Sequence, residues 1–435
     1  MTKNLLLLLS ICIALFACKK DSAFSSTELP GITTNPATNI TSTTAVSGGV
    51  ITINGNVTVI ASGLCWATTQ NPTISNNHTT DTTVTGTFTN NITNLLPANT
   101  YYVRAYVRTI ADTLYGNQLT IATPNMHIYI GGYELIGTKY VAKLWKDGTP
   151  SVLTNGTQNA GALSVYAVGN DVYIAGYESN GTKNVAKLWK NGVPTNLTNG
   201  ANDALANSVV VDNNIVYVAG YESNGTTTIA KLWKNGVATN LTNGTYDAGA
   251  NALTVVNHNV YVAGFETDAT QETKAKLWVN GVASNLSPSN YSTYASAIFV
   301  SGTDVYIAGY EASSFANLWV KLWKNGQEMN IAQGNFFFGR GTGVSVFGND
   351  VHLVGNTNDS GAAWWKNGSA TALVNNYFSR ANAVHVTGGN VYIVGTKRFY
   401  DVTNGNDLAT YWIDNVSTTL PHTGVFSYAT SIFVQ

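Results

Sequence analysis

Charged side chains of either sign are scarce in this chain. Its 435 residues include 22 basic and 23 acidic side chains, which together make up only 10%, against about 25% in typical soluble domains. The near balance argues against a nucleic-acid-binding protein, which needs a basic stripe on its surface. A hydrophobic content of 44% argues against a disordered chain, because it can supply a buried core.

Long hydrophobic runs are absent beyond the N-terminus, where Lys3 precedes an apolar run of 12 residues from Leu5 to Phe16. This length suits the hydrophobic region of a signal peptide and is too short to span a bilayer as a helix. The run ends in Leu15-Phe16-Ala17-Cys18, which resembles the lipobox of bacterial lipoproteins. The resemblance implies a signal peptide over residues 1–17, a lipid on Cys18 and an outer-membrane lipoprotein of the bacterial cell envelope. An ordinary secretory signal is the alternative.

The segment that follows, residues 18–30, is polar and is expected to form a tether. Its charged start, Lys19-Lys20-Asp21-Ser22, resembles the surface-export signal of some outer-membrane lipoproteins. The lipid would then be the only membrane anchor, and the resemblance implies exposure at the cell surface.

Cysteine is nearly absent, with three residues in the whole chain. Cys12 would leave with the signal peptide and Cys18 would carry the lipid. Cys65 then has no partner for an intrachain disulfide. Its apolar context, Gly63-Leu64-Cys65-Trp66, predicts a small buried hydrophobic residue rather than a reactive thiol.

The first folded unit is predicted over residues 31–123, where short alternating runs separated by turn signals are typical of a β-sandwich. The segment from Leu95 to Ala105 resembles the E–F corner and F strand of a fibronectin type III domain. The resemblance implies that Tyr101 is the corner tyrosine, and alternation places Val103 and Val107 on the core face. Such domains usually act as spacers or docking modules, and we predict no site in this unit.

The remaining residues, 125–435, repeat one unit seven times. The first marker, Ile128-Tyr129-Ile130-Gly131-Gly132-Tyr133-Glu134, has copies that begin 44, 44, 44, 45, 46 and 40 residues apart. The second marker is Lys-Leu-Trp followed by Lys-Asn-Gly. Four short strands in a unit of this length predict a β-propeller blade. The unit also resembles the HAF-type repeats of bacterial extracellular proteins.

The first strand of each unit predicts how the ring closes. It precedes units two to seven and recurs at the end of the chain, from Tyr428 to Val434, whereas Thr123-Pro124 directly precedes the second strand of unit one. The C-terminal strand should therefore complete the first blade and remove an open edge. The predicted fold class is all-β: a seven-bladed β-propeller preceded by a fibronectin type III-like β-sandwich.

Glu and Lys recur at fixed positions in blades one to five. Five of only eight Glu in the chain follow the aromatic residue of the first marker, and a Lys stands two residues before the recurrent Trp. Both are lost together in blades six and seven, so we interpret them as cross-strand ion pairs worth about 0.2–1 kcal/mol each. A ring of catalytic or metal-binding carboxylates is the functional alternative. The predicted pairs are Glu134–Lys143, Glu178–Lys187, Glu222–Lys231, Glu266–Lys276 and Glu311–Lys321.

Departures from the repeat predict a ligand site. The residue just before the small Ala or Gly that opens the inner strand is Gly or Leu in blades two to four but Tyr or Arg in the other four, where neighbouring loops also become aromatic. We expect aromatic faces there to stack on sugars or apolar groups, and Arg side chains to bind a carboxylate or sulfate. Alternatively, the aromatics cap the core and each Arg packs over a neighbouring ring. The predicted ligand-binding residues are Tyr294, Arg340, Arg380, Tyr428, Phe337, Tyr377, Phe315 and Arg398.

Catalytic and metal-binding patterns are scarce, and we expect no cofactor and no metal. His352 and His385 are interpreted as strand packing. Glycoside hydrolysis needs two facing carboxylates, and only Asp401 and Asp407 lie near the predicted face outside repeated positions. We therefore expect a non-catalytic, lipid-anchored envelope protein whose propeller binds an extracellular glycan or a protein partner. A structural subunit of a surface assembly and a propeller glycosidase or lyase are the alternatives.

Overall fold

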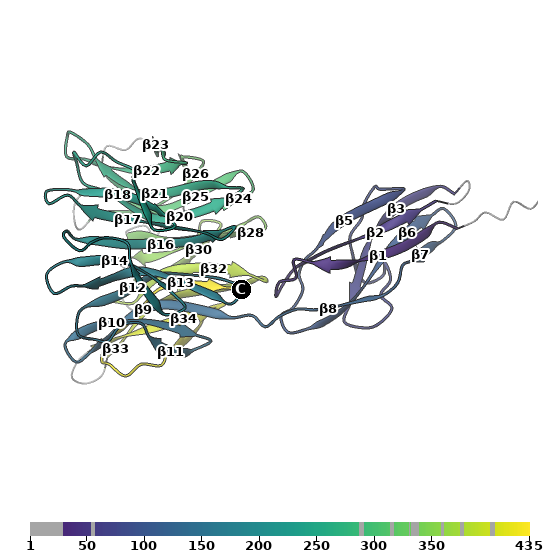
Figure 1. The fold of residues 1–435 in the computed structure, drawn as a ribbon, viewed down its shortest axis with the longest axis horizontal. Coiled ribbons are helices and arrows are strands. Elements are labelled where there is room, and N and C mark those ends of the chain that lie inside the picture. Colours follow the sequence, from purple (N-terminus) through teal and green to yellow (C-terminus); the bar gives the residue numbers. More distant parts are fainter. Residues whose placement is uncertain are drawn as a thin grey trace, which may run out of the picture. The chain divides into compact units, whose positions relative to one another are not determined.

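The structure, a computed structural model, describes residues 29–53, 57–286, 291–313, 317–329, 331, 339–357, 361–374, 378–400 and 405–435. It divides into two units (Figure 1). Among the described residues, the smaller unit comprises 29–39, 45–92 and 100–121, and the larger comprises 40–44, 93–99 and those from 122 to 435. No helix among the described residues is long and apolar enough to cross a membrane.

Eight strands form the smaller unit. They are β1 (Gly31–Thr38), β2 (Ala45–Thr52), β3 (Val59–Ala67), β4 (Asn77–His78), β5 (Gly86–Ile92), β6 (Thr100–Thr109), β7 (Thr113–Tyr115) and β8 (Leu119–Ala122). One sheet has the order β1-β2-β5, and the other has the order β4-β3-β6-β7, with β8 also paired to β6. The all-β, two-sheet arrangement agrees with the expected sandwich, and its assignment to the fibronectin type III family stays a prediction.

Alternate side chains of β6 enter the core of this unit. Val103 and Val107 are buried, as the period-2 pattern predicts, and so is Tyr101. The backbone N–H of Ala105, which lies between them, donates to Oγ1 of Thr34 in the other sheet at 2.9 Å. Burial of apolar side chains from both sheets is the main source of stability in a unit of this kind.

Cys65 is a free, buried cysteine in β3. Its thiol donates to the carbonyl oxygen of Pro72 at 3.3 Å. Burial raises the pKa of the Cys65 thiol to about 11, although nearby Arg104 lowers it slightly. The reactive thiolate is therefore suppressed at neutral pH, and Cys65 is the small hydrophobic residue that its context predicted.

Seven four-stranded sheets form the larger unit, and each sheet is one blade. Blade two is β12 (Ala160–Val168), β13 (Asp171–Ser179), β14 (Asn184–Lys190) and β15 (Val193–Asn196); blade three is β16 (Ala204–Asp212), β17 (Ile215–Ser223), β18 (Thr228–Lys234) and β19 (Val237–Asn240); blade four is β20 (Ala248–Val256), β21 (Asn259–Thr267), β22 (Thr273–Val279) and β23 (Val282–Asn285). Blade five is β24 (Ser292–Ser301), β25 (Asp304–Ala312), β26 (Leu318–Lys324) and β27 (Gln327–Glu328); blade six is β28 (Gly339–Phe347), β29 (Asp350–Thr357), β30 (Gly361–Lys366) and β31 (Ser369–Ala372). Blade seven is β32 (Arg380–Thr387), β33 (Asn390–Tyr400), β34 (Gly405–Ile413) and β35 (Val416–Thr419); blade one is β36 (Ser427–Val434), β9 (Ile128–Ile136), β10 (Lys139–Lys146) and β11 (Thr149–Val152).

The last strand of the chain closes the ring, as predicted. β36 pairs antiparallel with β9, so that Tyr428 lies opposite Tyr133 and Val434 lies opposite Ile128. The first strands of successive blades contact one another all the way round, including β36 with β32 and β12. The unit is therefore a closed seven-bladed β-propeller, and blade one combines both ends of the repeat region.

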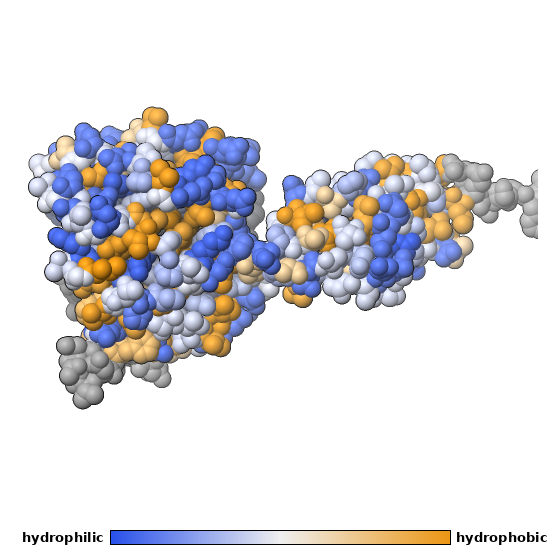
Figure 2. All heavy atoms as spheres, turned by 60° about the horizontal axis from the view of Figure 1, so that its bottom comes forward, coloured by the Kyte–Doolittle hydropathy of each residue, from blue (hydrophilic) through white to orange (hydrophobic). Residues whose placement is uncertain are grey.

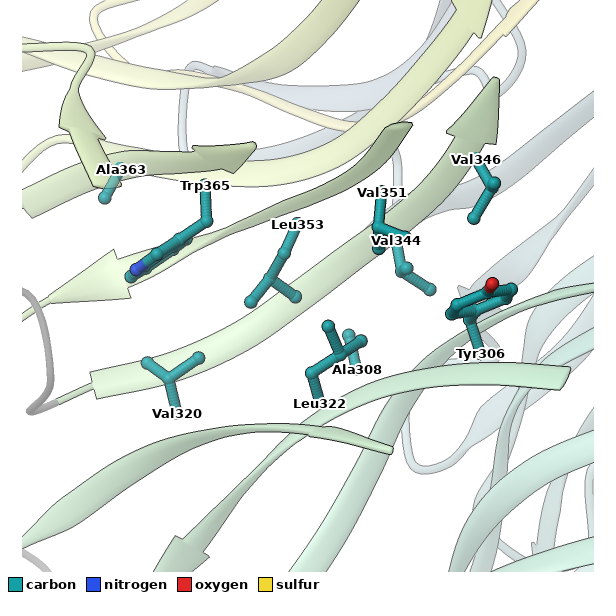
Figure 3. Close-up of a cluster of buried hydrophobic side chains, with 10 residues drawn as sticks. All are labelled: Tyr306, Ala308, Val320, Leu322, Val344, Val346, Val351, Leu353, Ala363 and Trp365. Carbon is teal, nitrogen blue, oxygen red and sulfur yellow. The ribbon is translucent and has the colours of Figure 1, made fainter. Parts of the chain in front are cut away.

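Apolar clusters fill the junctions between blades. Between blades five and six, Ala308 and Leu322 face Val344 and Leu353, and Trp365 lies beside them (Figure 3). Similar clusters occupy the other junctions. On the outside, hydrophobic residues lie in patches among hydrophilic ones (Figure 2). The recurrent Trp of every blade is buried: Trp145, Trp189, Trp233, Trp278, Trp323, Trp365 and Trp412.

The Asn-Gly turn between the third and fourth strands has a physical reason. In blade two, Asn191 and Gly192 have φ values of 51° and 81°, and a type I′ turn requires positive φ at both central residues. Oδ1 of Asn191 also accepts a hydrogen bond from the N–H of Val172 at 2.8 Å. The same bond occurs in all seven blades, with Asp147 and Asp414 as the acceptors in blades one and seven.

Candidate functional site

The candidate site lies at the end of the propeller where the inner strands begin. There, a residue near the start of each inner strand pairs with a residue near the end of the second strand of the same blade. The second strand supplies an aromatic partner in blades one to five and a small polar one in blades six and seven. The pairs are Tyr428–Tyr133, Gly161–Tyr177, Leu205–Tyr221, Gly249–Phe265, Tyr294–Tyr310, Arg340–Asn356 and Arg380–Thr396.

Glycine in blades two and four makes room for these aromatic rings. A Cβ atom at Gly161 would lie 2.9 Å from Cε1 of Tyr177, and one at Gly249 would lie 2.8 Å from Cε1 of Phe265. These blades therefore do not lack an aromatic group at this end, because the second strand provides it. The residues of the inner strands alone did not reveal these aromatic side chains of the second strands, although the repeated Gly-Tyr-Glu marker contains them. Only blades six and seven depart from the pattern.

In blade five, the faces of the aromatic rings are engaged in contacts within the protein. The rings of Tyr294 and Tyr310 stack with centroids 4.7 Å apart and an interplanar angle of 13°. The guanidinium carbon of Arg340 lies 4.8 Å from the centroid of Tyr310. In blade one, Tyr428 stacks on Tyr133 in a similar way at 5.0 Å. The alternative in which an Arg packs over a neighbouring ring thus describes Arg340, and the stack holds its side chain in place.

Arg340 and Arg380, both predicted ligand-binding residues, line one cavity of about 440 Å³. Asn356 and Thr357 take the places that an aromatic residue and Glu occupy in blades one to five, so shorter side chains leave room for this cavity. The complete lining is Leu318, Gly339, Arg340, Asn356, Thr357, Ser379 and Arg380. Among the described residues, the site therefore contains two cations and no carboxylate.

Hydrogen bonds between blades six and seven fix the spacing of the two Arg. Both backbone groups of Ala381, the residue after Arg380, are bound by blade six. Its N–H donates to Oδ1 of Asn356 at 2.8 Å, and its carbonyl oxygen accepts from the hydroxyl of Thr342 at 2.6 Å. The strands that carry Arg340 and Arg380 are thus locked in register on opposite sides of the cavity.

The polar atoms of the cavity are biased toward donors. Oδ1 of Asn356 is occupied by the Ala381 N–H, so its NH₂ group remains to donate. Oγ of Ser379 accepts from the N–H of Arg398 at 3.3 Å, so its hydroxyl hydrogen is also available. Arg340 and Arg380 carry only donors, their side chains are exposed, and neither forms an ion pair within the part of the chain that the structure describes. This arrangement suits an anion.

Arg398, a third predicted ligand-binding residue, is engaged internally. Its guanidinium donates to both carboxylate oxygens of Asp407, at 2.6 and 2.7 Å, and lies 4.4 Å from the ring centroid of Phe378. The hydroxyl of Tyr428 donates to Asp407 at 3.4 Å, and burial, followed by the charge of Asp407, raises the pKa of Tyr428 to about 12. Arg398 and Asp407 thus neutralise each other in a bidentate pair.

Several predicted residues lie outside the described residues. These are Cys18 with the signal peptide and most of the tether, and Phe315, Phe337, Tyr377 and Asp401. The site described above does not include them. Their predicted roles stay predictions.

All five predicted Glu–Lys pairs are within ion-pair distance. Four are partly exposed, with N–O distances of 2.8, 2.8, 2.9 and 3.4 Å in blades two to five. In blade one, Glu134 and Lys143 are buried, and the Glu134 carboxylate also accepts from the backbone N–H groups of Thr423 and Gly424. Burial would raise the pKa of Glu134, but the Gly424 N–H, Lys143 and the Thr423 N–H outweigh it and lower that pKa.

No group of three or more His, Cys, Asp or Glu side chains that could hold a metal ion occurs among the described residues. His352 is buried and stacks on Trp364, whose Nε1 donates to Nδ1 of His352 at 3.2 Å. His385 lies against Phe433 with ring centroids 5.3 Å apart. Both contacts are the strand packing that the sequence suggested.

Replacement of His385 by Asn should reduce the acid sensitivity of the propeller. Burial lowers the pKa of His385 from 6.5 to about 4, against a small upward effect of the Val434 backbone. Between these values the unfolded chain binds a proton that the folded chain does not, so the free energy of unfolding falls as pH falls from 6.5 to about 4. The loss is up to about 3 kcal/mol. Chemical denaturation across this window should show a smaller dependence of the free energy of unfolding on pH for H385N than for the parent. Equal dependence in the two proteins would refute the assignment.

Comparisons with known proteins add little to this geometry. No protein-family model and no curated protein matches the chain. The solved structure of YjhT is 12% identical over 59% of this chain and 96% of its own, with a TM-score of 0.35. TolB from Acinetobacter baumannii is 10% identical over 59% and 74%, with a TM-score of 0.36. An α-L-arabinofuranosidase from Clostridium thermocellum is 12% identical over 61% and 94%, with a TM-score of 0.28. Similarity at this level carries no argument about activity.

Proposed function

We propose that the propeller binds an acidic extracellular glycan, through a carboxylate or sulfate group, in the cavity between Arg340 and Arg380. One observation carries the proposal: the described lining of the cavity presents two guanidinium groups and further N–H and O–H donors, and it holds no carboxylate. Charge-assisted hydrogen bonds from such donors are the strong ones in anion recognition. The protein would act without catalysis and would be held at the cell envelope by a lipid on Cys18.

The loss of Glu in blade six supports this proposal. Thr357 lines the cavity at the position where blades one to five carry Glu. A carboxylate at that position would neutralise the neighbouring guanidinium groups and compete with an anionic ligand. Arg340 and Arg380 thus belong to blades six and seven, the two blades that carry no Glu at that position.

The size of the cavity favours a glycan over a folded protein. Its volume of about 440 Å³ falls within the range of small-molecule sites. A stable protein interface needs about 1,200 Å² of buried surface with an apolar centre, whereas the described lining is mostly polar. The absence of a carboxylate pair in that lining also supports a binding role over glycoside hydrolysis, which needs two.

The double variant R340A/R380A should lose binding of acidic glycans on an array and in titration calorimetry. Each lost charge-assisted contact is worth about 1.5–3 kcal/mol, so the affinity should fall at least about 100-fold. The matched control K190A/K234A removes the same charge from the opposite end of the ring, where both Lys close a third-to-fourth-strand turn. Equal binding by R340A/R380A and the parent would contradict the proposal.

A second variant keeps both Arg and closes the site. N356Y/T357E/A363K restores the aromatic residue, the Glu and the Lys of the other blades, so its cross-strand contacts should support folding as they do there. The N356Y change would fill the cavity with a ring, and T357E would place a carboxylate beside the guanidinium groups, because both positions line the cavity. Loss of acidic-glycan binding in a chain that still unfolds in one cooperative transition is the expected result. That transition should lie at a lower temperature than in the parent, because N356Y removes the acceptor for the buried Ala381 N–H. Retained binding would place the ligand elsewhere.

A further inference from the structure

A second hollow adjoins the anion cavity. It measures about 250 Å³ and shares two lining residues, Arg340 and Leu318, with the first. The remaining described lining comes from blade five: Ser292, Tyr294, Tyr310, Ala312 and Ser313. Since Arg340 and Leu318 line both spaces, the two hollows are immediate neighbours.

The chemistry of the second hollow differs from that of the first. Arg340, at the shared boundary, is the only charged residue in its described lining. Oγ of Ser292 accepts from the N–H of Thr273 at 3.2 Å, which leaves the hydroxyl hydrogen of Ser292 to donate. The hydroxyl of Tyr294 donates to Oγ1 of Thr273 at 3.3 Å, which leaves its oxygen to accept. The hollow thus offers both donors and acceptors beside the apolar side chains of Ala312 and Leu318.

An uncharged sugar matches that mixture, because each hydroxyl group both donates and accepts and the ring carbons are apolar. The first cavity, by contrast, offers mainly donors, and the planar guanidinium fork fits a planar carboxylate. Arg340 is held at the boundary by its contact with Tyr310, so it can reach the charged unit and the linkage to the next one.

We propose that the site binds two consecutive units of an acidic oligosaccharide, with a uronic acid in the Arg340–Arg380 cavity and a neutral sugar in the hollow of blade five. The inference rests on the proposed function and makes it specific: recognition requires the acidic unit and gains affinity from its neutral neighbour. A uronic acid alone would fill only the first cavity.

Titration calorimetry on the full chain tests this with three probes: glucuronic acid, cellobiouronic acid and cellobiose. Cellobiouronic acid should bind about 10-fold more tightly than glucuronic acid, a difference of about 1.4 kcal/mol, and cellobiose should not bind. The variant A312W places a large ring in the second hollow. It should reduce the affinity for cellobiouronic acid to within about 2-fold of that for glucuronic acid and leave the latter unchanged. The control A312S keeps the hollow open.

The outcomes separate the two proposals. If the unaltered chain binds glucuronic acid and cellobiouronic acid with equal affinity, the proposed site for a second sugar unit is wrong and the proposed anion site is unaffected. This comparison does not depend on the folding of any variant. Full cellobiouronic acid affinity in a folded A312W chain also overturns it. Failure of the unaltered chain to bind either acid overturns the two-unit uronic acid proposal, whereas the proposed function is overturned only if sulfated glycans on the array also fail to bind.

Discussion

Removal of residues 427–435 is expected to abolish the cooperative folding of the propeller unit. This segment contains β36, which is the inner strand of blade one and pairs with β9 along its length. Its Ala429, Ile432 and Val434 are buried in the cluster shared with blade seven, and its Phe433 packs against the cluster shared with blade two. Its loss would expose the edge of β9 and open two blade junctions. Ordinary domains are stable by only about 5–15 kcal/mol, so we expect the loss of this strand to prevent the ring from folding.

Circular dichroism and thermal denaturation of the truncated chain measure this effect. A synthetic peptide of residues 425–435 added to the truncated chain should restore the transition, because the strand can pair with β9 without a covalent link. A peptide with Ile432→Asp serves as the control and should not restore it. A truncated chain that melts within a few degrees of the parent would show that β36 is not needed for closure.

The substitution E134A should destabilise the propeller by about 3–5 kcal/mol, far more than the equivalent E222A. Glu134 and its partner Lys143 have side chains that are 0% and 4% exposed, whereas Glu222 and Lys231 are 21% and 14% exposed. Removal of Glu134 leaves Lys143 charged and buried without its partner. It also removes the acceptor for the N–H groups of Thr423 and Gly424, which lead into the closing strand.

The matched variant E222A should cost about 1 kcal/mol or less, because that pair is partly hydrated and, among the described residues, binds no backbone group of another strand. Denaturant titration gives both values. The double variant E134A/K143M should recover part of the loss, since it removes the unpaired charge as well. Similar values for E134A and E222A would mean that Glu134 has no special role in closure.

Much of the fold was predictable because the chain carries seven copies of its own pattern. The period indicated the blade, and the count of first strands indicated that Tyr428 to Val434 completes blade one, as the pairing of β36 with β9 confirms. Correlated loss of Glu and Lys indicated contacts such as Glu178–Lys187, which lie 2.8 Å apart. These features depend on strand period and register, which a sequence repeat displays directly.

The site was less predictable, because it depends on where side chains point across a sheet. The inner strands alone identified Arg340 and Arg380, which do line one cavity. They did not show that Gly161 makes room for the ring of Tyr177, nor that Arg398 is neutralised by Asp407. Such contacts join residues on neighbouring strands, and no pattern along a single strand reports them. The N-terminal leader stays a prediction.

Closure by the C-terminal strand also constrains the order in which the molecule can fold. Ile128, at the start of the ring, pairs with Val434, almost at its end, so this contact has very high sequence separation. Contacts of that kind form late in folding, because closing so long a loop costs conformational entropy before the contact can stabilise the fold. During synthesis from the N-terminus, the blades can form one after another while one edge of β9 stays unpaired. The ring can close, and fold as one cooperative unit, only after the C-terminal residues have been synthesised. A chain whose synthesis stops early would therefore keep the edge of β9 exposed, and cellular quality control could recognise that edge.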